Sequence, residues 1–288
     1  MGIHMKVVLS ISGPIWQFFV VTVLAISCAG GTIDADEKRR ELLESGSNFE
    51  VNGRTAFLIP GATGKSLSGK AWVWYAPTLP RLPGPEERWM FEQFVAEGIS
   101  IAGIDAGESY GSPDGNLVYD SLYQHLTKMG YSSRPVMLGR SRGGLMTLSW
   151  AFHNPDRVAA FAGIYPVMNI GSYPGVGRAA AAFQLSAAEL TKRLREFNPV
   201  DNLQPLADRK VPMFVIHGDV DKVVPLELNT GLVVARYRDA GASLELVVPN
   251  GQGHNMWQGF FQCKKLVEFV IRHAHNSILP DSDPAATE

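Results

Sequence analysis

The fold is decided by the stretch Val136-Met137-Leu138-Gly139-Arg140-Ser141-Arg142-Gly143-Gly144. Its three apolar residues predict a buried strand, and the sequence after Gly143 predicts a helix. Between them, Gly-x-Ser-x-Gly centres on Ser141, and the small residues on either side let the chain turn sharply. A serine at such a strand–turn–helix junction projects above the sheet at the start of the helix, whose dipole favours developing negative charge. We therefore predict that Ser141 is a catalytic nucleophile and not part of an ordinary tight turn.

Strand and helix patterns alternate on both sides of this stretch. Strands are predicted at 49–51, 54–59, 71–75, 99–104, 136–138, 158–164, 213–216 and 244–248, and helices at 86–97, 117–129, 143–153, 187–197, 226–240 and 257–273. Asn52-Gly53 predicts a hairpin turn between the first two strands. A hairpin followed by strand–helix units predicts the α/β class, with a mostly parallel sheet and helices on both faces. No strand is predicted between 168 and 210, so 168–197 is interpreted as a small lid insertion.

Composition excludes several classes of protein. Of the 288 residues, 45% are hydrophobic, which is too many for a disordered chain, and two cysteines are too few for a disulfide scaffold. Lys and Arg number 26 against 28 Asp and Glu, a balance that argues against electrostatic binding of nucleic acid. The length suits one large α/β domain, which we predict at 30–279.

Both ends of the chain differ from this domain. Residues 7–27 carry no charge and are followed by small residues and then by a polar segment, so 1–29 is predicted to be a secretory signal peptide. Cleavage after Ala29, lipoprotein-type acylation of Cys28 and an uncleaved membrane anchor all stay open. We expect a secreted or periplasmic protein that touches a membrane only through this leader or a lipid anchor. Residues 280–288 are predicted to be a disordered tail.

A serine nucleophile needs a base and a carboxylate that orients the base. Among seven histidines, His254 is predicted to be the base because it follows the last strand in a loop that can reach over the sheet. His217 ends a strand and is interpreted as structural. Asp219 and Asp221, in the loop after the penultimate strand, are both candidates for the carboxylate. Either one gives the chain order serine, aspartate, histidine.

Three motifs resemble those of the α/β-hydrolase superfamily. They are Gly139-Arg140-Ser141-Arg142-Gly143-Gly144, His217-Gly218-Asp219-Val220-Asp221-Lys222-Val223-Val224-Pro225 and Gly253-His254, within a resemblance that spans about 49–273. The first is similar to that of dienelactone-hydrolase-like and prolyl-oligopeptidase-like members. The family pattern H-G-x-x-D-x-x-V-P implies that Asp221 is the acid of the triad, with Asp219 capping its loop. The resemblance implies an α/β-hydrolase fold and no metal or organic cofactor.

An oxyanion hole and a substrate site should lie around the triad. The N–H of Arg142 is the expected first oxyanion donor. The second is expected from the loop after the strand at 71–75, where Pro77 has no N–H, so Ala76 is favoured and Thr78 is the alternative. Predicted substrate-binding residues are Arg140, Glu108, Tyr75 and Trp257. Arg140 and Arg142 flank the nucleophile and could bind a substrate carboxylate; alternatively, both pair with protein carboxylates such as Glu108. Tyr75 could donate its hydroxyl to the oxyanion, and Trp257 could line a pocket for a sugar or acyl group or belong to the core.

The function predicted from these features is hydrolysis of a carboxylic ester of a small molecule or carbohydrate, through an acyl-enzyme. A peptidase or acyltransferase with the same triad is the first alternative. An alternative of another class is a non-catalytic, membrane-tethered binding protein. The P-loop-like Gly61-Ala62-Thr63-Gly64-Lys65-Ser66 is dismissed because Ile59 stands where the first glycine belongs and no helix is predicted to follow.

Overall fold

The computed structural model describes residues 42–63 and 69–278. The predicted leader at 1–29 and the predicted tail at 280–288 lie outside these residues. Within the described ranges, no helix is long and apolar enough to cross a membrane.

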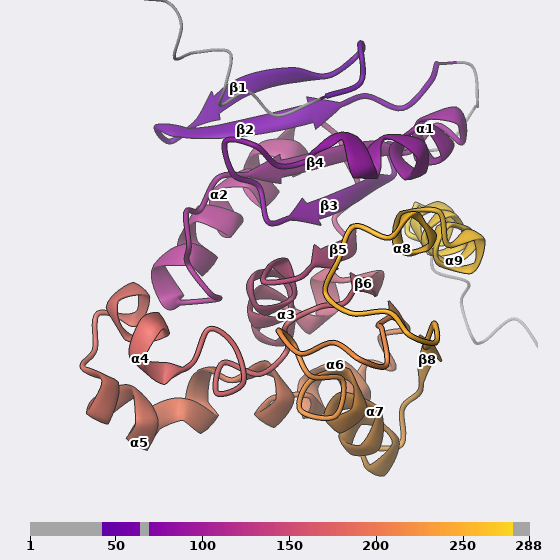
Figure 1. Ribbon diagram of the computed structural model, residues 1–288. Helices are drawn as coiled ribbons and strands as arrows, with labels where there is room; N and C mark the ends of the chain where they lie inside the picture. Colours follow the sequence, from indigo (N-terminus) through magenta and orange to yellow (C-terminus); the bar gives the residue numbers. More distant parts are fainter. Residues whose placement is uncertain (1–41, 64–68, 279–288) are drawn as a thin grey trace, which may run out of the picture. The chain divides into compact units, whose positions relative to one another are not determined.

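Eight strands form one sheet, with the order β1-β2-β4-β3-β5-β6-β7-β8 (Figure 1). The strands are β1 Ser47–Val51, β2 Arg54–Ile59, β3 Trp72–Ala76, β4 Ser100–Ile104, β5 Val136–Arg140, β6 Ala160–Ile164, β7 Met213–Ile216 and β8 Leu244–Val247. β2 is antiparallel to β1 and β4, and all other neighbours are parallel. Since β3 to β8 run parallel, the loops that follow them meet at one edge of the sheet, where the predicted catalytic residues lie.

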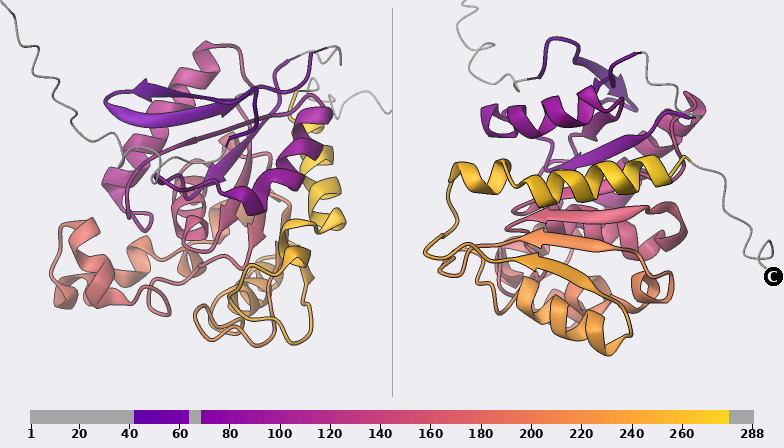
Figure 2. Two further views of the ribbon diagram at one scale, coloured as in Figure 1. Left: turned by 45° about the horizontal axis from the view of Figure 1, so that its top comes forward. Right: turned by 90° about the vertical axis from the view of Figure 1, so that its right-hand side faces the viewer.

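Helices cover both faces of the sheet (Figure 2). They are α1 Arg88–Ala96, α2 Pro113–Lys128, α3 Gly143–His153, α4 Val176–Ala179, α5 Ala187–Phe197, α6 Gln204–Asp208, α7 Thr230–Asp239, α8 Gln258–Phe261 and α9 Lys264–Asn276, with a short 3₁₀ turn, η1 Pro85–Glu87, before α1. One apolar core joins the sheet to α2, α3, α6 and α7, and the other joins it to α1, α8 and α9. The predicted α/β-hydrolase architecture is confirmed.

Three predicted helices differ from the structure by more than two residues at one end or by a break. α2 begins at Pro113, four residues earlier than predicted, because Ser112 caps it and proline suits the first turn. α7 begins only at Thr230, since the chain before it forms turns around the buried Asn229. The last predicted helix is divided into α8 and α9 at Cys263, whose extended backbone interrupts the helical conformation.

The insertion between β6 and β7 packs around a third apolar cluster, which it shares with the main body. This cluster includes Ile170, Phe183 and Leu190 of the insertion, together with Leu145 and Val224 of the main body. The fully buried Asn229 ties the start of the insertion to the main body, because its side-chain oxygen accepts from the backbone N–H groups of 168 and 169. The insertion is therefore anchored beside the loop that carries Asp221.

Candidate active site

Ser141 occupies a strained turn between β5 and α3. Its φ of +50° lies in the left-handed region, which non-glycine residues adopt at a cost. The turn is tight: a Cβ on Gly143 would overlap the Ala76 carbonyl oxygen, and one on Gly144 would lie 2.5 Å from the Val167 oxygen. The Ser141 N–H donates to the Ile164 carbonyl at 3.0 Å. Neighbouring strands thus hold the serine in a turn whose following positions only glycine can occupy.

The structure brings the three predicted triad residues together. Ser141 Oγ lies 2.8 Å from His254 Nε2, and His254 Nδ1 lies 2.8 Å from Asp221 Oδ2. Because a carboxylate only accepts, Nδ1 carries the proton, and Nε2 is left to accept from the serine hydroxyl. This arrangement can remove a proton from Ser141 as its oxygen attacks a carbonyl.

Asp221 is held as a carboxylate by several donors. Its Oδ1 accepts from the N–H groups of Val223 and Val224, at 2.9 and 2.8 Å. Burial by itself raises the pKa of Asp221, but hydrogen bonds from His217, His254 and Val224 outweigh it and hold that pKa well below its ordinary value. The residue therefore stays charged and can stabilise an imidazolium at His254.

His217 has the structural role that its position predicts. It is fully buried, and its Nε2 lies 2.8 Å from the Val224 carbonyl, which can only accept. The proton is therefore on Nε2, and Nδ1 accepts from the Thr230 hydroxyl at 2.8 Å. Nε2 also lies 3.5 Å from Asp221 Oδ2, so His217 supports the acid rather than the serine. The other candidate acid, Asp219, accepts from the Gln252 N–H and ties the acid loop to the histidine loop.

The two predicted oxyanion donors lie in different surroundings. Arg142 is the N-cap residue of α3, so its N–H makes no intrahelical bond and can serve a ligand. Ala76 ends β3, is fully buried, and presents its carbonyl oxygen to Gly143. The assignment of the Ala76 N–H as second donor stays a prediction.

Arg140 and Tyr75 differ from our expectation. Only 5% of Arg140 is exposed, and its Nη1 lies 2.6 Å from Glu87 Oε1. Tyr75 is fully buried, and its hydroxyl donates to the same oxygen at 2.7 Å. Burial and the nearby Glu87 charge raise the pKa of Tyr75 well above its usual range. The prediction that these two residues bind substrate therefore does not fit the structure, because both face a buried carboxylate.

Arg142 and Glu108 form a more open pair at the mouth of the site. Arg142 Nε lies 3.0 Å from Glu108 Oε2, and the contact is an ion pair without a hydrogen bond. Both side chains are partly exposed. Of our two interpretations, the one in which the arginines pair with protein carboxylates describes the observed contacts, with Glu87 as the partner of Arg140.

Trp257 and Met256 lie next to each other in the histidine loop, but only Trp257 was predicted to line a pocket. In the structure, Trp257 packs edge-on against Phe260 with ring centroids 5.4 Å apart. Met256 contacts Arg140, with its sulfur 3.0 Å from Nη2. A buried arginine at a strand end signals that a partner must exist, but the sequence alone did not identify Glu87 or Met256.

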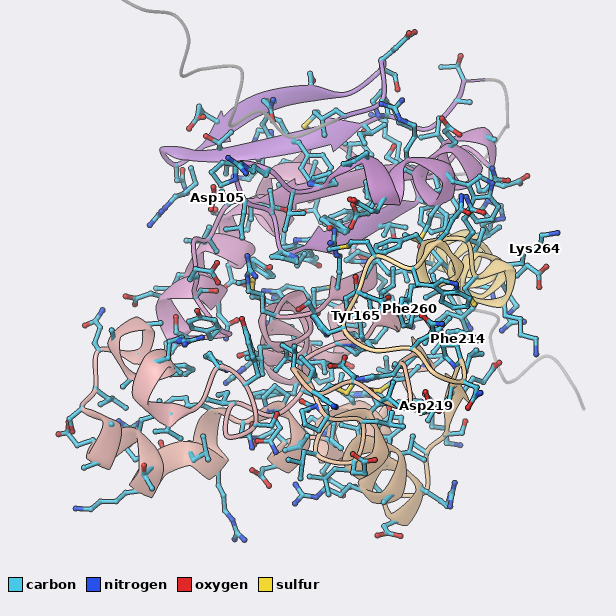
Figure 3. The ribbon with its side chains drawn as sticks, in the orientation of Figure 1. Asp105, Tyr165, Phe214, Asp219, Phe260 and Lys264 are labelled. Carbon is cyan, nitrogen blue, oxygen red and sulfur yellow. The ribbon has the colours of Figure 1, made fainter. Side chains whose placement is uncertain are left out.

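Tyr165 is a second residue of the site that the sequence did not predict. It follows β6 as Ser141 follows β5, and it too has a positive φ, of 33°. Its ring lies against His254, with centroids 4.4 Å apart, and edge-on to Phe260, which lies beside it in Figure 3. Tyr165 thus packs directly against the catalytic imidazole. Among the residues that the structure describes, no group of three or more His, Cys, Asp or Glu side chains could hold a metal ion.

The fold and the Ser–His–Asp triad define a serine hydrolase with the α/β-hydrolase fold. The family model described as the prolyl oligopeptidase family matches residues 119–277, more than half of the chain. The chain therefore belongs to the prolyl oligopeptidase family.

Solved structures with the same fold are distant in sequence. A puromycin-hydrolyzing peptidase of Mycobacterium tuberculosis is 15% identical with a TM-score of 0.61, over 81% of this chain and 39% of that one. The Pyrococcus horikoshii acylaminoacyl peptidase is also 15% identical, with a TM-score of 0.61, over 79% of this chain and 41% of that one. Est1E from Butyrivibrio proteoclasticus is 15% identical with a TM-score of 0.59, over 80% of this chain and 98% of that one. Among curated protein sequences, none matches the chain.

The chain thus spans about two fifths of the two peptidases and nearly the full length of Est1E. At this level of identity, the likeness shows a common fold. The family membership and the catalytic triad identify a serine hydrolase, without deciding which acyl substrate it cleaves.

Proposed function

We propose that the protein hydrolyses carboxylic esters through Ser141, His254 and Asp221. The observation that carries this proposal is the continuous pair of 2.8 Å contacts from Ser141 Oγ to His254 and from His254 to Asp221. The serine stands in the turn, next to the start of a helix, that a nucleophile of this chemistry requires.

The reaction proceeds in two halves. Ser141 Oγ attacks the ester carbonyl while His254 Nε2 takes the hydroxyl proton, and the carbonyl oxygen becomes an oxyanion beside the Arg142 N–H. The tetrahedral intermediate collapses, the C–O bond to the alcohol breaks, and His254 returns its proton to the leaving oxygen. Water then attacks the acyl-enzyme with the same base, and the acid and Ser141 are released. Asp221 stays charged throughout and holds the imidazolium.

Ester hydrolysis requires less of the site than peptide hydrolysis. An alkoxide leaves more readily than an amine anion, so a triad with an oxyanion donor suffices for esters, whereas amide cleavage depends more on binding energy from the rest of the substrate. Peptide hydrolysis is the second candidate, because the family to which the chain belongs is named for an oligopeptidase.

A serine-directed fluorophosphonate probe tests the nucleophile. We expect the wild-type protein to be labelled and Ser141→Ala to be unlabelled, to stay folded and to lose on the order of 10⁶ in turnover. Equal labelling of the two proteins would remove Ser141 from the mechanism.

Matched substrates test the choice between ester and amide. We expect p-nitrophenyl acetate and short-chain homologues to be hydrolysed far faster than anilides with the same acyl groups. Comparable rates on peptide anilides would favour the peptidase.

We also propose that residues 1–29 direct export of the protein. The support is the uncharged run at 7–27 followed by small residues. Sequencing the amino terminus of the mature protein tests this proposal, and an intact Met1 on cytosolic protein would contradict it.

A further inference from the structure

A cleft of about 480 Å³ opens beside the loop that carries the catalytic histidine. Its lining residues come from the histidine loop, from α8 with the residue that follows it, and from the segment formed by η1 and α1, and α8 contacts η1. Met256 forms part of its wall and stands two residues after His254. The volume is within the range of sites that hold small molecules.

The apolar part of the lining consists of Pro85, Trp89, Met256 and Phe261. Phe261 is buried, and the Arg140 guanidinium lies 5.1 Å from its ring centroid. Arg140 is in turn fixed by the buried Glu87. The buried ion pair therefore holds Phe261 in place, while Trp89 and Met256, which are partly exposed, provide the apolar surface that a ligand can reach.

The rest of the lining is polar and carries more negative than positive charge. It includes Glu86, Glu92, Gln258 and Gln262, against a single cation at Arg88. Carboxylates accept hydrogen bonds and cannot donate them, so a ligand covering them must bring donors. A plain acyl chain brings none and would desolvate these groups at a cost, and an anionic ligand would face two like charges.

An uncharged ring with hydroxyl groups meets both requirements. Its apolar face can lie against Trp89 and Met256, and its hydroxyls can donate to the carboxylates and amides around it. His254, two residues before Met256 of the cleft wall, is the group that returns a proton to the leaving alcohol. The ring therefore belongs to the alcohol side of the substrate.

We propose that this cleft binds a neutral sugar ring on the alcohol side of the scissile ester, which makes the substrate an O-acylated neutral carbohydrate. This inference rests on the proposed ester hydrolysis. It differs from our sequence-based expectation in two ways: Trp89 and Met256 form the site in place of Trp257, and the preferred sugar carries no carboxylate.

The test compares an acetylated methyl glucoside with p-nitrophenyl acetate, phenyl acetate and an acetylated methyl hexuronide. We expect the wild type to have its lowest KM for the neutral glucoside. Trp89→Ala should raise that KM about tenfold while kcat changes little, because the lost contact is made equally in the ground and transition states. Tyr123→Ala removes another half-buried aromatic side chain, on α2 and outside the cleft lining, and should leave that KM within about twofold.

A direct binding measurement makes failure of the two proposals distinguishable. Saturation-transfer NMR with methyl glucoside on the Ser141→Ala protein should show binding that the added Trp89→Ala substitution removes. If p-nitrophenyl acetate is cleaved but Trp89→Ala changes neither the glucoside KM nor this binding, the sugar site is wrong and the esterase stands. A lowest KM for phenyl acetate, or for the hexuronide, would likewise overturn the neutral sugar. If no ester is cleaved but glucoside binding depends on Trp89, the esterase fails and the sugar site stands.

Discussion

Arg140 and Arg142 flank the same serine, yet they meet very different surroundings. Arg140 is buried against Glu87, whose two oxygens also accept from the Tyr75 hydroxyl and the Gly84 N–H. Arg142 faces Glu108 at a partly exposed site, where solvent screens the charges. The two arginines cannot be distinguished in the sequence. In the fold, Arg140 forms a buried structural ion pair, and Arg142 stays partly exposed beside the nucleophile.

The buried pair should matter for stability far more than the open one. Arg140→Met leaves Glu87 charged and without its cation, and we expect a loss of about 3–5 kcal/mol in the free energy of unfolding. Adding Glu87→Gln to this variant should restore part of the loss, since the buried charge is gone. Urea denaturation measures both.

The matched control is Arg142→Met, which we expect to change the free energy of unfolding by less than about 1 kcal/mol because the pair with Glu108 is screened. Equal losses at the two arginines would contradict the distinction drawn between them.

At the scale of elements, the turn between β5 and α3 depends on close approach to β3. The Ala76 carbonyl lies where a Cβ on Gly143 would have to go. Neither group can rotate away, because the carbonyl is part of the backbone and a Cβ is bonded directly to it. Strand pairing between Ala76 and Gly139 keeps β3 from moving away. The nucleophile is therefore positioned by an adjoining strand as well as by its own turn.

Gly143→Ala should abolish activity and destabilise the fold, because the added carbon would overlap the Ala76 carbonyl and cannot be accommodated without moving β3. Gly177→Ala makes the same change within α4, where nothing lies within 4 Å of the added carbon. It should leave activity intact and raise stability by roughly 0.5–1 kcal/mol. Thermal unfolding and ester hydrolysis of both variants provide the measurement, and an active Gly143→Ala enzyme would refute the argument.

Site residues could be predicted from the sequence where they lie in one short motif, but not where two residues far apart in the chain make the contact. The turn around Ser141 and the loop around Asp221 lie in short stretches whose spacing reflects backbone geometry, so their residues can be identified from the sequence alone. Glu87 contacts Arg140 across 53 residues of chain, and nothing near either residue reveals the other. The size of Trp257 favours it as a pocket residue, but backbone direction in the histidine loop makes Met256 the one that faces the cleft.

For the molecule as a whole, Asp221 links stability to pH. Its pKa is lower in the folded chain than in the unfolded chain, so the folded state binds that proton less readily. The stabilisation is complete above the ordinary pKa of an aspartate, near 4, and is lost as the pH falls below it toward the folded value.

We expect the free energy of unfolding to fall as the pH is lowered below about 4, and Asp221→Asn to show a shallower dependence in that range. Urea titrations of the two proteins at several pH values measure this difference. Parallel curves would mean that Asp221 has the same proton affinity folded and unfolded.

The insertion between β6 and β7 has a consequence for engineering. Phe183 and Leu190 pack in a cluster separate from the two cores that flank the sheet, whereas Met168 belongs to one of those cores. The 169–197 segment can therefore be varied as a cassette while the two cores keep their residues. Libraries confined to this segment, with Asn229 retained as its tether, should yield a high proportion of folded members. Directed evolution of new substrate preferences can therefore begin there, at the least risk to the sheet that carries the nucleophile.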